Sequence, residues 1–236
     1  MTTETLPAPD TAAAPRGRPL LWAAFVLFVL AVPVTAWLLQ QKRTGDAPPP
    51  LATLPGFSLT AQDGRVMTLE DFRGRIWVAN FIFTSCQGAC PLLTQKMAGV
   101  QKWIVEAEKE SRSGRLPILL ASFTVDPKVD TPERLTAYGD KYGADFGRWH
   151  FLTGPLPEIE RTVVKGFRMS MDAGMSGIED GRDAPSFEQA YDIMHGERFV
   201  LVDWQGRIRG YYVTDREGLG NLSRDIRSLL AEMGAG

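Results

Sequence analysis

The sequence predicts an α/β sandwich, in which helices pack on a central mixed sheet, preceded by one N-terminal transmembrane helix. Three observations lead there: a long uncharged apolar segment near the N-terminus, strand-like runs that alternate with helical runs, and a closing hairpin and helix. With 44% hydrophobic and 23% charged residues, the chain can bury a sizeable core. Because the formal net charge is −2 and no long basic block occurs, nucleic acid is not expected as a partner.

The uncharged segment covers residues 19–41. As a helix rising ~1.5 Å per residue it would extend about 35 Å, and the hydrocarbon core of a bilayer is roughly 30 Å thick. Trp22 and Trp37 lie near its ends, where interfacial aromatic residues are favoured. A cleaved secretory signal is the alternative, although its apolar core normally has only about 7 to 15 residues. We therefore expect a short N-terminus over 1–18, a transmembrane anchor over 19–41, a proline-rich linker over 42–53, and one globular domain over 54–236.

The globular domain is expected to begin with short strands and then a long buried strand. Residues 57–72 indicate two short strands around a turn at Asp63-Gly64, followed by a short helical step. Residues 75–83, "RIWVANFIF", form a nearly continuous apolar run, as expected of a strand buried on both faces. From Pro91 to about Glu110, apolar residues recur at helical spacing.

The rest of the domain alternates strands with helices and ends in a hairpin and a helix. Thr131 as N-cap and Pro132 at the first helical position punctuate one of these helices. The hairpin is expected to turn at Gln205-Gly206. This order is typical of a thioredoxin-type sandwich. The predicted elements are a strand at 116–125, a helix at 130–143, a strand at 150–154, a helix at 156–167, the hairpin over 198–213 and a helix over 218–233.

The two cysteines of the chain, Cys86 and Cys90, lie where the buried strand turns into a helix. On the first helical turns, an offset of four residues brings side chains to one face, with Cβ atoms about 5 to 6 Å apart. That distance permits either a disulfide or a shared metal ion. The redox motif of thioredoxins normally has two intervening residues, and two thiolates alone seldom satisfy a transition metal. A disulfide staple, a redox pair and part of a metal site all remain open at this point.

A third metal ligand could come from one of the two histidines. His150 falls inside a predicted strand next to Trp149, so we expect a structural or surface role for it. His195 precedes the predicted hairpin on a loop that could fold over the cysteine end of the sheet. The residues alone leave it open whether His195 is a ligand or an ordinary loop residue. A set of two cysteines and one histidine suits copper and is acceptable to zinc, so the metal stays open too.

Four segments of the chain occur together in one known family, in the same order across residues 54–232. They are "LEDFRGRIWVANFIFTSCQGACP", "FTVDPKVDTPERLTAY", "WHFLTG" and "HGERFVLVDWQGRIRGYY". In this combination the chain resembles the Sco/SenC family of copper-binding, thioredoxin-fold proteins. The resemblance implies that Cys86, Cys90 and His195 bind copper, as Cu(I) or Cu(II). It also implies a metallochaperone that assists assembly of the binuclear copper centre of cytochrome c oxidase by ligand exchange.

The resemblance also implies a location and partners. Charges on both sides of the anchor leave its orientation open, and the family supplies it. Residues 1–18 would be cytoplasmic, and the chain would cross the inner membrane once, with the domain in the periplasm. The expected partners are the copper-bearing subunit of cytochrome c oxidase and a second periplasmic copper chaperone.

Other functions use the same two cysteines. Whether the chain is an enzyme depends on a thiol-disulfide reductase activity, in which the redox pair Cys86 and Cys90 reduces the copper-binding thiols of the oxidase subunit. A general redoxin, with Cys86 attacking and Cys90 resolving, is a further alternative. An inert Cys86–Cys90 disulfide is the third, although a staple closing so small a loop would constrain the unfolded chain little.

Two positions depart from the family pattern. Gln87 stands where proline usually follows the first cysteine, which gives the loop more freedom and a spare N–H donor. Met194 precedes His195 where an acidic residue is common.

Two further clusters have two interpretations each. Met169, Met171 and Met175 could receive or deliver Cu(I), or could fill gaps beneath a long loop. Asp126 and Asp130 could orient a group of the site or contact a partner, or could cap the following turn and helix.

Overall fold

The computed structural model describes residues 47–111, 114–169 and 198–234, together with residues 22, 25, 27, 29, 31 and 32. The chain forms two compact units, Met1–Asp46 and Ala47–Gly236. Within the first unit, the six described residues are helical. Among all described residues, no helix combines the length and apolar character needed to cross a membrane. Most of the predicted anchor, residues 19–41, lies outside the described part, so the anchor stays a prediction.

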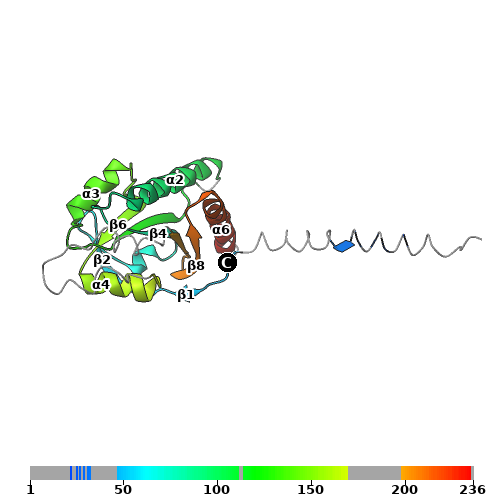
Figure 1. Ribbon diagram of the computed structural model, residues 1–236, viewed down its shortest axis with the longest axis horizontal. Helices are drawn as coiled ribbons and strands as arrows, with labels where there is room; N and C mark the ends of the chain where they lie inside the picture. The colour runs from blue at the N-terminus through cyan, green and yellow to red at the C-terminus, as the bar shows by residue number, and fades with distance from the viewer. Residues whose placement is uncertain are drawn as a thin grey trace, which may run out of the picture. The chain divides into compact units, whose positions relative to one another are not determined.

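The second unit is built on one mixed sheet (Figure 1). Among the residues that the structure describes, its strand order is β1-β8-β7-β4-β5-β6-β2-β3. β4, β5 and β6 run parallel, whereas β7 is antiparallel to β4 and pairs with β8. The strands are β1 (Ala52–Thr53), β2 (Ser58–Ala61), β3 (Val66–Thr68), β4 (Ile76–Ile82), β5 (Ile118–Thr124), β6 (Trp149–Thr153), β7 (Arg198–Val202) and β8 (Arg207–Val213).

Helices cover both faces of this sheet. α2, α3 and α6 pack on one face, and α4 with η2 and η1 on the other (Figure 1). The side chains of β4 contribute to the cores on both faces of the sheet. Ile76, Val78 and Ile82 enter the core beneath α2. Trp77 and Ala79 enter the core on the opposite face. The helical segments are η1 (Leu69–Phe72), α2 (Ala89–Glu110), α3 (Pro132–Lys141), α4 (Leu156–Glu160), η2 (Arg161–Gly166) and α6 (Arg216–Gly234).

The predicted α/β sandwich and mixed sheet are confirmed, with differences at element ends. The helix after the cysteines begins at Ala89 instead of Pro91, so Cys90 lies inside its first turn. The single helix predicted at 156–167 is an α-helix that continues as the wider π-helix of η2. Residues 47–53 of the predicted linker belong to the second unit, where β1 pairs with β8.

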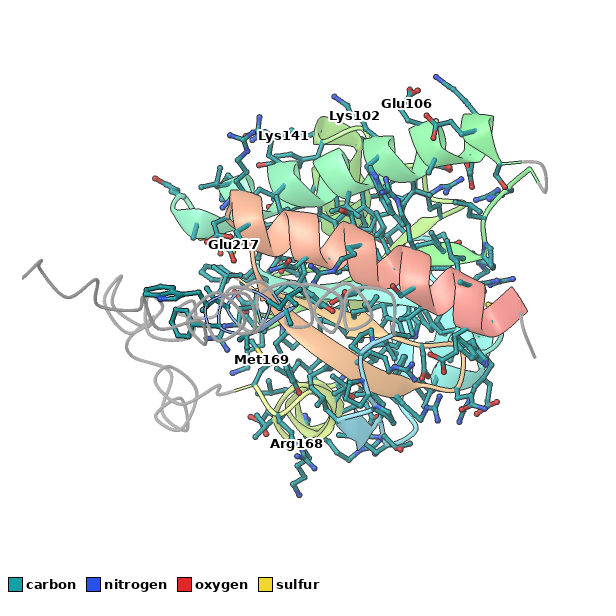
Figure 2. All side chains as sticks on the ribbon, turned by 90° about the vertical axis from the view of Figure 1, so that its right-hand side faces the viewer. Lys102, Glu106, Lys141, Arg168, Met169 and Glu217 are labelled. Carbon is teal, nitrogen blue, oxygen red and sulfur yellow. The ribbon has the colours of Figure 1, made fainter. Side chains whose placement is uncertain are left out.

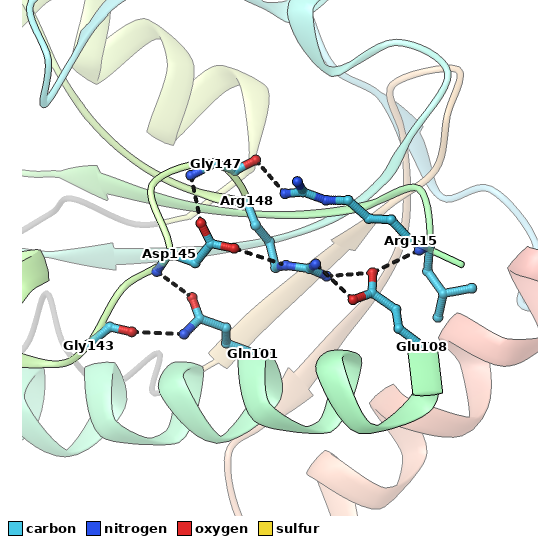
Figure 3. Close-up of polar contacts among 8 residues, drawn as sticks. Gln101, Glu108, Arg115, Gly143, Asp145, Gly147 and Arg148 are labelled. Carbon is cyan, nitrogen blue, oxygen red and sulfur yellow. Dashed lines mark hydrogen bonds and ion pairs between the residues drawn. The ribbon is translucent and has the colours of Figure 1, made fainter. Parts of the chain in front are cut away.

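A buried ion pair fastens the C-terminal half of α2 to the segment before β6 (Figure 3). The guanidinium of Arg148 donates to both carboxylate oxygens of Glu108, at 3.0 and 2.9 Å. The Arg148 side chain is only 4% exposed. Two turns earlier in α2, the Gln101 amide donates to the Gly143 carbonyl at 2.9 Å and accepts from the Asp145 N–H at 2.8 Å. These contacts fix the end of α2 that lies away from the cysteines.

We expect Glu108→Ala to lower the free energy of unfolding by about 3 kcal/mol, because it leaves the buried Arg148 charge without its bidentate acceptor. Urea unfolding of the two proteins measures this difference. Glu106→Ala on the same helix is the matched control, since its partner Lys109 is 66% exposed and such surface pairs contribute about 0–1 kcal/mol. Equal losses in the two variants would contradict a structural role for the Arg148 pair.

Candidate metal centre

Cys86 and Cys90 lie at the junction of β4 and α2, as the sequence predicts. β4 ends at Ile82, and Cys86 follows in the connecting loop with its side chain half-buried. Cys90 is the second residue of α2 and is 1% exposed. The two thiols are not joined by a disulfide. The N-cap residue Gly88 offers no side chain, and the first turn of α2 carries no acidic residue.

The start of α2 stabilises a thiolate on Cys86. The Cys90 thiol donates to the Cys86 sulfur, and the backbone N–H groups of Cys90, Gly88 and Ala89 also point at it. Together they outweigh burial and lower the pKa of Cys86 to about 6. The same hydrogen bond and its own burial raise the pKa of the Cys90 thiol far above its usual range. At neutral pH the pair therefore holds one thiolate, on Cys86, and one proton, on Cys90.

We expect iodoacetamide to modify Cys86 and spare Cys90 in the reduced, metal-free protein. Because the thiolate is the reactive form, the rate should rise with pH through a midpoint near 6. Mass spectrometry of the cysteine peptide locates the modification, and Cys86→Ser should remove it. A midpoint near the ordinary thiol value of about 8.5 would mean that the helix start does not stabilise the thiolate.

Asp130 holds the loop that leads into the cysteines. Its carboxylate is fully buried and accepts hydrogen bonds from the Thr84 N–H, at 3.1 and 3.2 Å to its two oxygens. The hydroxyls of Thr84 and Thr124 also donate to it. Thr84 precedes Cys86 by two residues, so Asp130 holds the loop that leads to the site, and the site-orienting role, one of the two that the sequence left open, stays a prediction.

The sequence also predicted a helix cap and a turn near Asp130, and Thr131 and Asp126 form them. Thr131 caps α3 as predicted, accepting from the Arg134 N–H at 3.4 Å. The Val129 N–H donates to the backbone carbonyl of Asp126 at 3.2 Å, which stabilises the turn before α3. Burial, followed by the nearby Asp130, raises the pKa of Asp126.

His150 lies in the interior and away from the cysteines. In β6 it pairs with Ala121, and its ring packs edge-on against Phe72 at 6.2 Å on the sheet face opposite α2. It is 7% exposed, and its Nδ1 atom is buried without a hydrogen-bond partner. Burial, with smaller effects of Arg65 and Arg75, lowers the pKa of His150. The predicted structural role is confirmed.

His195 lies outside the described residues. The next described part of the chain is β7, which starts at Arg198 and runs antiparallel to β4 with Val200 opposite Ala79. The beginning of β7 is therefore at the end of the sheet where β4 finishes and the chain continues to Cys86. Among the described residues, no three His, Cys, Asp or Glu side chains group closely enough to hold a metal ion. The third ligand thus remains a prediction.

Residues 46–231 match the family model described as SCO1/SenC. The chain belongs to the SCO1/SenC family. The SCO1 protein homolog of Bacillus subtilis is 30% identical over 151 residues, which are 64% of this chain and 72% of that protein. The mitochondrial SCO2 homolog of Bos taurus is 29% identical over 73% of this chain and 58% of its own length.

Solved structures of SCO1/SenC relatives share the thioredoxin-like fold. BsSco, described as a member of the Sco family of cytochrome c oxidase assembly proteins, has a TM-score of 0.61 at 30% identity, covering 78% of this chain and 98% of its own. A SCO1/SenC family lipoprotein from Bacillus anthracis has a TM-score of 0.59 at 30% identity, covering 76% and 96%. ScoI of Bradyrhizobium japonicum, solved with copper bound, shares the fold at 21% identity and a TM-score of 0.54, covering 73% and 99%. Copper is thus a ligand of that ScoI protein.

The structure describes two of the residues that the sequence singled out beside the ligand candidates, Gln87 and Met169. Gln87, in the position where the family usually has proline, is exposed in the loop. Met169 packs, partly buried, against the core on the face opposite α2, and it follows η2 together with Arg168 (Figure 2). Its packing favours the gap-filling interpretation, whereas Met171 and Met175 lie outside the described residues.

Sequence reasoning missed Thr84, the residue of the cysteine loop to which Asp130 binds. Thr84 stands 46 positions before Asp130, and no local spacing signals their contact. A weak signal exists, because Asp130 follows the fully buried strand β5 by six residues, and an aspartate that is buried there must find hydrogen-bond donors.

Proposed function

We propose that this chain is a copper metallochaperone that assists assembly of the binuclear copper centre in a cytochrome c oxidase subunit. The observation that carries the proposal is the thiolate and thiol pair of Cys86 and Cys90 at the start of α2, in a chain of the SCO1/SenC family. Thiolates are soft ligands that suit Cu(I). Related proteins described as a cytochrome c oxidase assembly protein and as a copper-bound ScoI point the same way.

The proposed ligands are the sulfurs of Cys86 and Cys90 and the imidazole of His195. Copper bound by both sulfurs takes the place of the proton on Cys90, so binding releases it. A neutral imidazole completes a three-coordinate set and helps to accommodate Cu(II).

Transfer requires the acceptor to replace these ligands one at a time. His195, which the sequence predicts to lie on a loop, is the first candidate to leave. Cys86 follows, because its sulfur is half-buried and reachable, and Cys90 is last because it is 1% exposed. Copper thus remains bound to at least one protein ligand until the acceptor holds it.

Thiol-disulfide reduction is the second candidate function, and the low pKa of Cys86 favours it. The Cys86 thiolate would attack one sulfur of the target's disulfide, releasing the other as a thiolate. Cys90, after losing its proton, would attack Cys86 in the mixed disulfide. The target would leave as a reduced dithiol, and Cys86 and Cys90 would end as a disulfide.

We also propose the location that this function needs. Residues 1–18 are cytoplasmic, residues 19–41 cross the inner membrane, and the domain faces the periplasm, where it meets the oxidase subunit and a second copper chaperone. Related proteins described as a lipoprotein and as mitochondrial support an association with membranes.

The test loads the full-length protein with copper and mixes it with a metal-free oxidase copper domain, supplied either as dithiol or as disulfide. The wild type should bind one copper per chain and transfer it to the dithiol form. Because His195→Ala removes a direct ligand, it should weaken copper binding about a hundredfold or more and alter the Cu(II) spectrum. His150→Gln is the control and should leave both unchanged. If His195→Ala matches the wild type in stoichiometry, spectrum and transfer, the histidine assignment is wrong. If the protein instead reduces the disulfide form of the oxidase domain without transferring copper, the reductase function is favoured.

A further inference from the structure

We propose that Thr94 and Tyr138 are positioning residues for the copper site. A buried hydrogen-bond chain that runs from the Tyr138 hydroxyl through the Thr94 hydroxyl to the Cys90 carbonyl holds the first turn of α2 in its ligating geometry. The inference rests on the proposed function, since it concerns the same two sulfurs.

The chain has two links of equal length. The Thr94 hydroxyl donates to the carbonyl oxygen of Cys90 at 2.8 Å, and the Tyr138 hydroxyl lies 2.8 Å from the same Thr94 oxygen. A hydroxyl has one proton to donate, so Tyr138 must be the donor to Thr94. Thr94 is fully buried and Tyr138 is 8% exposed, so water does not compete for these bonds.

The first turn of α2 needs such support because no side chain caps it. The N-cap residue is Gly88, and no acidic side chain lies in the turn. The N–H groups of Gly88, Ala89 and Cys90 donate to the Cys86 sulfur, and that of Cys90, the second helical residue, is one that a side-chain cap would normally occupy. A shift of the Cys90 backbone would therefore move the Cys90 sulfur and the N–H donors of Cys86 together.

α3 holds the cysteine segment at two points. Asp130, just before α3, binds Thr84 upstream of Cys86. Tyr138, within α3, reaches Thr94 downstream of Cys90. Tyr138 is itself fixed by packing against Phe151, with ring centroids 6.3 Å apart. The cysteine segment is thus held on both sides by one packed element.

A purely structural role is the alternative, because a buried tyrosine hydroxyl usually finds a partner and helical threonine often bonds the carbonyl four residues back. The two roles differ in what a variant changes. Loss of a merely structural bond lowers stability alone. Loss of a positioning bond also changes copper affinity and the sulfur-to-copper absorption band.

The experiment measures Cu(I) affinity by chelator competition and the Cu(II) absorption band in full-length Tyr138→Phe and Thr94→Val. Each should lower affinity about tenfold, the range seen when partners of metal ligands are removed, and shift the band. Thr94→Ser keeps the hydroxyl and should behave as wild type. The double variant should bind no more weakly than either single variant, because both break one chain.

Tyr212→Phe is the matched control. Tyr212 is also 8% exposed, and its hydroxyl donates to Asp225 at 2.8 Å instead of to α2. It should lower the unfolding temperature without changing affinity or band. If Tyr138→Phe and Thr94→Val behave like this control, the positioning role is refuted.

The proposed function can fail separately. If the wild type binds no copper, the proposed copper function is wrong. The positioning role of Thr94 and Tyr138 can then still be tested alone, by the rate at which iodoacetamide modifies Cys86 in the metal-free protein. The rate at a fixed pH near 6 should fall in Tyr138→Phe and not in Tyr212→Phe. Equal rates in the two variants would overturn the inference.

Discussion

Cys86→Ser and Cys90→Ser are each expected to abolish copper retention. A structural zinc site with four ligands provides about 10–16 kcal/mol, so one ligand provides roughly 2.5–4 kcal/mol, or about a hundredfold to a thousandfold in affinity. Serine offers a hard oxygen that stays protonated at neutral pH, and it cannot replace a thiolate for Cu(I). Cys90→Ser should have a second effect, because the Cys90 thiol contributes most to lowering the pKa of Cys86.

Copper content after gel filtration, and affinity by chelator competition, measure this loss. Ser85→Ala is the matched control, since Ser85 is an exposed neighbour in the same loop. It should retain copper as the wild type does. Retention of copper at wild-type affinity by Cys90→Ser would show that Cys90 is not a ligand.

Asp130→Ala is expected to have the second largest effect, on stability and on copper together. It removes the acceptor of the Thr84 N–H and of the Thr84 and Thr124 hydroxyls, in a site with no access to solvent. Leaving such donors unpaired should cost about 3 kcal/mol. Because Thr84 leads into Cys86, the freed loop should also weaken copper binding about tenfold.

Urea unfolding and copper affinity test both parts of this prediction. Asp130→Asn keeps one carbonyl oxygen as acceptor and should lose less than Asp130→Ala. Asp140→Ala, at an exposed position of α3, is the control and should change neither quantity. A destabilised Asp130→Ala protein that binds copper normally would mean that Asp130 supports the fold without orienting the site.

Much of the fold could be predicted because its signals are local. The continuous apolar run of β4 reports burial on both faces, and it is confirmed by the two cores that β4 separates. The helical periodicity after the cysteines predicts α2, but the expected start at Pro91 is two residues late. Proline is accepted within the first turn of a helix, so it did not mark the boundary.

The site was predictable only in part. The spacing of Cys86 and Cys90 suggests a shared face, whereas the thiolate on Cys86 depends on how the first turn of α2 is capped. The contacts of Asp130 with Thr84 and of Tyr138 with Thr94 join positions more than forty residues apart, and only the packing of α3 brings them together. His195 was assigned through the family resemblance, because nothing in its local sequence distinguishes a ligand from a loop residue.

X-ray absorption at the copper edge tests the account most directly, because it identifies the atoms bound to the metal. The Cu(I)-loaded full-length protein should show two sulfur ligands and one nitrogen ligand, and His195→Ala should lose the nitrogen while keeping both sulfurs. A spectrum with sulfur ligands alone in the wild type, or a nitrogen that survives His195→Ala, would contradict the proposed copper centre.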